Sequence, residues 1–194
     1  HRLYCYLYHT RDLGLWLVFS PGALSIVGFS DADHANDPEN TARSTSAGVL
    51  FIRSAGGSLM PIDWFSRTQT ATARSTPEAE IVSLAELVFS AGLPLQEVLF
   101  QVTEREIPMH IGTDSQATEG IVRAGSSRRL AYLRRYQRVS ISSLRDVFAA
   151  WQNVLFGVRS KEIPADVLTK PLTDEEHSCG LASLGMALRT AGQP

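Results

Sequence analysis

Four acidic residues lie at positions from which their carboxylates could act together. Asp31 and Asp114 each end an apolar run that is typical of a strand. Glu80 lies in the first turns of a helical pattern, and Asp166 lies early in a short helical segment that begins at Pro164. Converging carboxylates repel one another, which raises their pKa values. A hard divalent cation such as Mg²⁺ relieves this repulsion, because it prefers oxygen ligands. The pattern therefore favours a metal site.

The chemistry that such a site could perform is hydrolysis of a phosphodiester. Two divalent ions about 4 Å apart can hold the attacking water and the leaving oxygen of an in-line cleavage, and no protein nucleophile is needed. The cysteines and histidines of the sequence do not have the spacing of a zinc site. The candidates for both catalysis and metal binding are therefore acidic: Asp31, Glu80, Asp114 and Asp166.

The elements that must position these acids begin with three strands. Apolar runs separated by turn residues predict strands over residues 24–31, 46–53 and 60–66. The polar stretch 32–44, which contains Asp37-Pro38, is predicted to be a loop. Three sequential strands with turn signals between them indicate an antiparallel meander.

The pattern then changes to the helical period. A helix is predicted to start with Thr76 as its N-cap, or with Ser75 and Glu78 as a capping box. We expect Gly92 and Pro94 to interrupt it before a short second helical piece. The remaining predicted elements are a strand over 107–114, a helix over 115–124, a long helix with a basic face over 129–148, a strand over 153–159, a short helix over 164–168 and a tail helix over 181–188.

This order predicts an α/β fold. We expect a five-stranded mixed sheet, with three antiparallel strands followed by parallel strands, flanked by helices. If the first and fourth strands are parallel neighbours, Asp31 and Asp114 project from adjacent carboxyl ends, where open α/β sheets place their sites. Asp31 shares a strand face with Val27 and Phe29, so it can lie at the rim of a buried face.

The distribution of charge is more informative than its sum. The chain has 194 residues and a formal net charge of −2, which by itself does not indicate a nucleic-acid binder. Arginines nevertheless gather in the second half of the chain, at Arg128, Arg129, Arg134, Arg135 and Arg138. Such a cluster is either a solvated helix face or a phosphate-binding surface, since arginine suits bidentate phosphate recognition. We take the five as candidate nucleic-acid-binding residues.

Four segments that carry the acids resemble, in order, the signature blocks of the ribonuclease H domain of copia-type retrotransposons. They are 28–33 (GFSDAD), 75–80 (STPEAE), 113–116 (TDSQ) and 163–172 (IPADVLTKPL). The resemblance covers roughly residues 24–172, and residues 1–20 resemble the tail of the preceding reverse transcriptase. Each block alone is a weak signal, but all four in the right order and each on the right element are a strong one.

The resemblance implies a ribonuclease-H-like fold and a four-carboxylate site for two Mg²⁺ ions, with Mn²⁺ able to substitute. The expected activity is endonucleolytic hydrolysis of the RNA strand of an RNA–DNA hybrid during reverse transcription. The implied partners are the hybrid and the reverse transcriptase domain of the same polyprotein. The resemblance further implies that Asp31 and Asp114 contact both sides of the metal pair, that Glu80 supports one metal and its water, and that Asp166 completes the other.

Each candidate acid also fits an ordinary structural role. Asp114 could cap the helix that follows it, and Asp166 could be an ordinary acid in a first helical turn. Glu78 suits the helix dipole and is expected to be structural rather than catalytic. We expect Asp33 to point away from the Asp31 face, as a loop or surface residue.

Three other functions fit parts of the pattern. The chain could be a catalytically inactive hybrid-binding module from a degenerate element, because no histidine lies between His110 and His177 to help product release. It could be another nuclease on the same fold, such as an integrase or a resolvase, although the block around Thr169-Lys170-Pro171 argues against this. It could also be a translated relic without selected activity.

The organisation that we expect has three parts. Residues 1–20 are the reverse transcriptase tail, 21–172 the ribonuclease-H-like domain, and 173–194 a C-terminal tail. No apolar run approaches the length of a membrane span, and we expect no membrane partner. Few cysteines and no signal peptide predict an intracellular, cytoplasmic location, within a retrotransposon ribonucleoprotein or virus-like particle.

Overall fold

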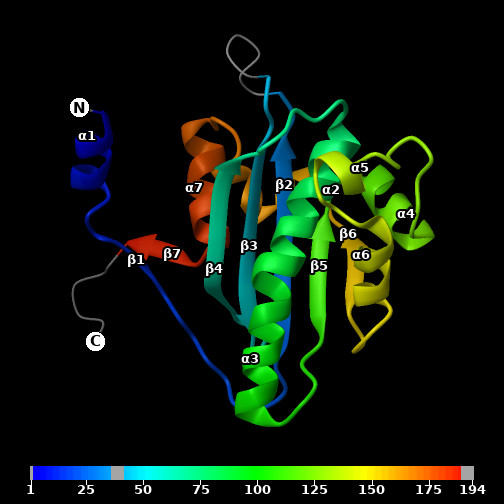
Figure 1. Ribbon diagram of the computed structural model, residues 1–194. Coiled ribbons are helices and arrows are strands. Elements are labelled where there is room, and N and C mark those ends of the chain that lie inside the picture. Colours follow the sequence, from blue (N-terminus) through cyan, green and yellow to red (C-terminus); the bar gives the residue numbers. More distant parts are fainter. Residues whose placement is uncertain (1, 36–41, 189–194) are drawn as a thin grey trace.

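The strand-forming runs pair into one mixed sheet in the computed structural model, which describes residues 2–35 and 42–188 (Figure 1). Its strands are β2 (Ser25–Asp33), β3 (Thr45–Arg53), β4 (Leu59–Thr68), β5 (Met109–Thr113) and β6 (Val154–Gly157). They lie in the order β4-β3-β2-β5-β6. The first three are antiparallel, whereas β5 and β6 extend the sheet in parallel. The predicted α/β class and five-stranded mixed sheet are confirmed.

One continuous helical rod covers a face of this sheet. It consists of α2 (Thr76–Glu86), the π-helical segment η1 (Leu87–Gly92) and α3 (Leu93–Thr103). The predicted interruption at Gly92 and Pro94 is therefore wrong. A π turn shifts the hydrogen-bond pattern, which accommodates a proline that would otherwise break an α-helix. Gly92 is needed for close packing, because a Cβ there would lie 2.6 Å from the sulfur of Met109.

The length of this helical rod corrects the expectation that no apolar segment approaches the length of a membrane span. The helix over Thr76–Thr103 is long and apolar enough to cross a membrane, judged by length and composition alone. Since it does not break at Gly92, it exceeds the apolar length that the sequence indicated. In this fold its inward side chains cover the sheet, with Ile81, Leu84 and Leu87 at most 1% exposed.

The second half of the chain contains more, shorter helices than expected. They are α4 (Gln116–Ala124), α5 (Leu133–Tyr136) and α6 (Ile141–Phe148). The predicted single helix over 129–148 is wrong, although Leu133 and Leu144 are both buried on the expected apolar side. Arg138 adopts a left-handed φ of 58°, and Ser140 caps α6 by accepting a hydrogen bond from the amide of Ser143. These two local features separate α5 from α6.

A second core lies on the opposite face of the sheet. The short 3₁₀ segment η3 (Pro164–Leu168), which confirms the predicted short helix, buries Ile163 and Ala165 against Val27, Phe29 and Val49. It follows η2 (Ser160–Glu162), and α7 (Asp174–Ser183) packs on it. The hydroxyl of Ser66 on β4 donates a hydrogen bond of 2.6 Å to the carbonyl of Leu168, which fixes the end of η3 to the sheet.

The two flanking segments pair with each other. After α1 (Arg2–His9), strand β1 (Leu13–Leu15) lies antiparallel to β7 (Met186–Leu188), away from the main sheet (Figure 1). The predicted tail helix over 181–188 is wrong, because α7 ends at Ser183 and Gly185 turns the chain with a φ of 77°. The predicted loop over 32–44 starts only after Asp33, and its Asp37-Pro38 lies outside the described residues.

Packing of the continuous rod on the sheet predicts unequal effects of truncating its apolar side chains. Leu84→Ala removes a fully buried side chain and is expected to lower the free energy of unfolding by about 2–5 kcal/mol, through reduced burial and an unfilled cavity. Val98→Ala, whose side chain lies on α3 and is 56% exposed, should change it by less than about 0.5 kcal/mol. Urea denaturation followed by circular dichroism measures both, and equal losses of stability would contradict the packing.

Candidate metal centre

Three acids from three elements converge at one edge of the sheet. A carboxylate oxygen of each of Asp31, Glu80 and Asp114 lies within 4.8 Å of the other two. Strands β2 and β5 run parallel, with Phe29 opposite Gly112. Continuing this register by two residues brings Asp31 beside Asp114, which directly follows β5. The predicted pairing of neighbouring parallel strands therefore explains how these two carboxylates meet.

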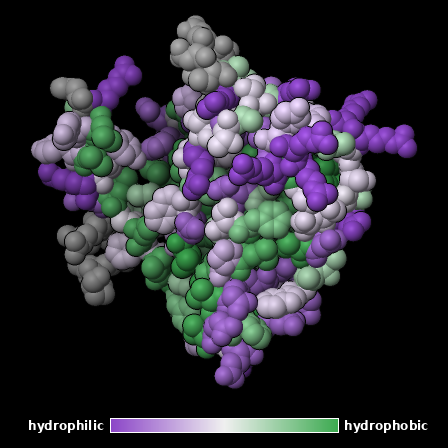
Figure 2. Space-filling view, in the orientation of Figure 1, coloured by the Kyte–Doolittle hydropathy of each residue, from purple (hydrophilic) through white to green (hydrophobic). Residues whose placement is uncertain are grey.

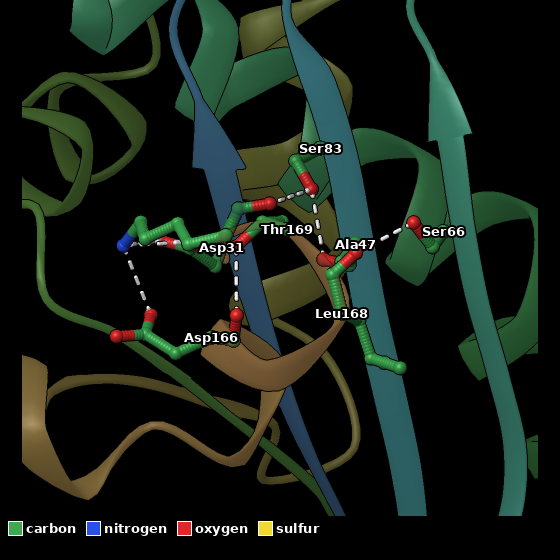
Figure 3. Close-up of polar contacts among 8 residues, drawn as sticks. Asp31, Ala47, Ser66, Ser83, Asp166, Leu168 and Thr169 are labelled. Carbon is green, nitrogen blue, oxygen red and sulfur yellow. Dashed lines mark hydrogen bonds and ion pairs between the residues drawn. The ribbon is translucent and has the colours of Figure 1, made fainter. Parts of the chain in front are cut away.

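Asp31 lies inside β2 rather than at its end. Its side chain is almost entirely buried, at 1% exposure. The hydroxyl of Thr169 donates a short hydrogen bond to Oδ2 of Asp31 (Figure 3). The ammonium of Lys170 lies 3.4 Å from each carboxylate oxygen of Asp31. The segment after η3 therefore provides both a hydroxyl and a cation to the most buried acid of the site.

A buried serine fixes the helix that carries Glu80. The hydroxyl of Ser83 donates to the backbone carbonyl of Asp31 at 2.7 Å and to that of Ala47 at 3.0 Å (Figure 3). Because Ser83 lies one turn after Glu80, these bonds set the position of Glu80 relative to β2 and β3. The side-chain amide of Gln69 also donates a hydrogen bond of 2.9 Å to the backbone carbonyl of Ala79.

Glu80 is a buried acid whose hydrogen bonding is incomplete. It is 4% exposed, and its Oε2 has no hydrogen-bond partner among the described residues. Burial, followed by the charges of Asp31 and Asp114, raises the pKa of Glu80 to about 8. An unpartnered buried oxygen among three carboxylates fits a hard divalent cation, which takes oxygen ligands and relieves the repulsion.

Asp166 stands beside this cluster rather than within it. Its Oδ1 lies 3.1 Å from the ammonium of Lys170, which also contacts Asp31. Burial is the largest cause that raises the pKa of Asp166, Asp31 raises it further, and Lys170 lowers it. Of the four predicted acids, three come together directly, and the fourth is joined to them through Lys170.

Asp33 and Lys170 are site residues that the sequence interpretation missed. The expectation that Asp33 faces away from Asp31 is wrong, because β2 continues to Asp33 and residues two apart in a strand share a face. Burial and the charge of Asp31 raise the pKa of Asp33, whereas Lys170 lowers it. The strand period could have identified Asp33. Lys170 follows Asp166 by four residues, but no local pattern indicates its contact with Asp31.

Glu78 has the structural role that was expected of it. It is 1% exposed, and its Oε2 accepts hydrogen bonds from the backbone amide of Arg74 at 2.8 Å and from the hydroxyl of Tyr132 at 2.6 Å. Ser75 is the N-cap of α2 without a side-chain bond, so the predicted N-cap at Thr76 is wrong and the capping box does not form. Glu78 instead binds the residue before the N-cap.

The five candidate arginines are all exposed. Arg134 and Arg135 lie on α5, and Arg138 follows it. The Tyr132–Glu78 bond, together with a weaker one from the amide of Gln137 to Glu78, attaches this segment to the first turn of α2, near Glu80. Figure 2 shows hydrophilic side chains gathered over this upper part of the molecule. The segment that carries Arg134, Arg135 and Arg138 is therefore attached to the turn of α2 that leads to Glu80.

Comparisons with known proteins agree with this architecture. No protein-family model matches the chain. Among solved structures, ribonuclease H1 from the halophilic archaeon Halobacterium salinarum NRC-1 is similar, with a TM-score of 0.50, 19% identity and coverage of 75% of this chain and 94% of that chain. The fold is therefore ribonuclease-H-like, as the sequence resemblance implied.

Two curated proteins are similar in sequence. A truncated transposon Ty1-A Gag-Pol polyprotein of Saccharomyces cerevisiae is 26% identical over 175 residues, which cover 89% of this chain and 14% of that protein. Secreted RxLR effector protein 161 of Plasmopara viticola is 35% identical over 85 residues, which cover 44% of this chain and 55% of that protein. The chain thus spans only part of the length of each relative.

The raised pKa of Glu80 predicts a pH-dependent stability of the metal-free protein. In the unfolded chain this carboxyl has its ordinary pKa near 4.5, and in the folded protein about 8. The folded state therefore retains a proton that the unfolded state loses, so this contribution to stability is complete below pH 4.5 and is lost as the pH rises through about 8. Glu80→Gln, which stays neutral, should not show this loss.

Denaturation in EDTA across this pH range tests the prediction. Each pKa unit corresponds to about 1.4 kcal/mol, so the variant should exceed the original protein by a few kcal/mol near pH 8 and match it near pH 4.5. Glu106→Gln, at an exposed position, is the matched control and should leave the profile unchanged. Parallel profiles for Glu80→Gln and the original protein would show that folding does not change the pKa of Glu80.

Proposed function

We propose that this chain is a divalent-metal-dependent ribonuclease H of a copia-type retrotransposon polyprotein, which hydrolyses the RNA strand of RNA–DNA hybrids. The observation that carries the proposal is the cluster of buried Asp31 and Glu80 with half-buried Asp114 on a ribonuclease-H-like sheet. Among the described residues, Oε2 of Glu80 has no hydrogen-bond partner, which suits a metal ion at that cluster. The likeness to a Gag-Pol polyprotein supports the retrotransposon origin.

The residues present fit Mg²⁺, or Mn²⁺ in its place. Asp31, Glu80 and Asp114 would hold one ion, and Asp166 with Asp31 would hold a second. When bound, such ions activate a water for attack and stabilise the leaving oxygen of the phosphodiester. The chain itself supplies the rigid placement of these acids, through the bonds of Ser83 to the strands and of Thr169 to Asp31.

Recognition of the substrate would rest on the surface beside these acids. The arginines on and around α5 would contact phosphates of the hybrid, next to the turn of α2 that precedes Glu80. Contacts to 2′-hydroxyls in the shallow minor groove would distinguish the RNA strand from DNA. Within the proposed polyprotein, the reverse transcriptase domain would be the partner, and the particle that carries both would be intracellular.

The first test is cleavage of a labelled RNA–DNA hybrid in Mg²⁺ or Mn²⁺, with EDTA as the metal-free control. Asp114→Asn removes one charged ligand and is expected to reduce the cleavage rate by more than about 100-fold. Asp63→Asn, at an exposed position on β4, is the matched control and should cleave like the original protein. Hybrid binding without cleavage by the original protein would instead support an inactive binding module.

The arginine surface generates a separate prediction. Replacing Arg134 and Arg135 together by alanine should weaken hybrid binding and lower the slope of log Kd against log salt concentration by about one for each phosphate that the protein no longer neutralises. The rate at saturating hybrid should change little, because neither residue contacts the carboxylates in any described interaction. Arg105→Ala, an exposed arginine just beyond α3, is the control. If the double variant keeps the affinity and the salt slope of the original protein, α5 does not contact the hybrid.

A further inference from the structure

We propose that Lys170 is an internal cation that competes with the second metal ion for Asp31 and Asp166. The free protein would then hold one divalent ion tightly, at Asp31, Glu80 and Asp114, and a second one only weakly. This inference rests on the proposed function in one respect, which is that the carboxylates bind metal at all.

The geometry places one ammonium between two carboxylates of the site. Nζ of Lys170 lies 3.1 Å from Oδ1 of Asp166 and 3.4 Å from both carboxylate oxygens of Asp31. The side chains of Asp166 and Asp31 are 23% and 2% exposed, respectively, so both charges are partly withdrawn from water. At such distances and in such surroundings a unit charge is strongly attracted, and a divalent ion placed on the same oxygens would be repelled by it.

The two halves of the site are therefore unequal. On the side of Glu80, three carboxylates converge and Oε2 of Glu80 has no partner among the described residues. On the side of Asp166, the lysine already offsets one of the two negative charges of Asp31 and Asp166. A first ion shares only one of its three carboxylates, that of Asp31, with the ammonium, whereas a second ion on Asp31 and Asp166 competes with the ammonium for both of its carboxylates.

The lysine can leave without disturbing the backbone that carries it. The hydroxyl of Thr169 binds both Asp31 and the carbonyl of Asp166, and Ser66 holds Leu168, so the main chain before Lys170 is fixed. The Lys170 side chain is 33% exposed and has a flexible four-carbon stem. Rotation of that side chain towards solvent would expose Asp166 to the second ion.

Calorimetric titration with Mn²⁺ of the free protein tests this directly and needs no substrate. The original protein should bind one ion tightly, and Lys170→Met should bind the second ion about tenfold or more tightly than the original does, because a neighbouring positive charge is gone. Lys161→Met, at an exposed lysine, is the matched control and should titrate like the original protein.

Two further variants locate the second ion and guard against misfolding. Adding Asp166→Asn to Lys170→Met should abolish the gain in affinity for the second ion, because that ion then lacks the carboxylate of Asp166. Lys170→Gln keeps a hydrogen-bond donor for Asp166 and removes the charge, so it should show the same gain. Circular dichroism and melting temperatures establish that each variant is folded before titration.

Each outcome decides between the alternatives. Tighter binding of the second ion in both Lys170 variants, reversed by Asp166→Asn, supports the inference. Equal second-ion affinity in folded Lys170 variants and the original protein overturns it, while tight binding of the first ion would leave the proposed metal-dependent function standing. No Mn²⁺ binding by any of the folded proteins overturns both.

Discussion

The convergence of three acidic side chains, two of them almost fully buried, is the constraint on which the rest of this structure depends. Asp31 and Glu80 are 1% and 4% exposed, and their mutual repulsion opposes the arrangement unless rigid elements enforce it. Ser83 provides this rigidity, because its buried hydroxyl joins α2 to the backbone of β2 and β3 at the level of the acids. These two hydrogen bonds explain why Ser83, a polar residue, lies in the middle of the buried face of α2.

The mixed topology of the sheet determines where the acids can meet. Parallel pairing of β2 with β5 aligns Asp31 with Asp114 at one edge, and β2 runs on past that point to Asp33. The helix that follows the antiparallel strands crosses the sheet and begins at the same edge, which brings Glu80 to the two aspartates. Elements from distant parts of the chain thus contribute one carboxylate each.

The polar network around the acids also connects them to the outer surface. Glu78 binds Tyr132 from within the first turn of α2, so the arginine-bearing segment is anchored two residues from Glu80. On the other side, Thr169 and Lys170 reach Asp31 from the end of η3. The carboxylates therefore lie between a basic surface segment and the ammonium of Lys170, an arrangement that suits the proposed nuclease function.

The sequence by itself determined the order of the five strands of the main sheet and which element carries each acid, because periodicity and turn residues are local signals. The same local signals led to two wrong predictions. Pro94 lies within a continuous helical rod that it was expected to interrupt, and the helix expected over 129–148 is broken by a left-handed residue at Arg138. Only the tertiary structure decided that Lys170 pairs with Asp31, 139 residues away, and that β1 pairs with β7. Such contacts depend on how whole elements pack, and the residues that make them carry no pattern that reveals the distant partner.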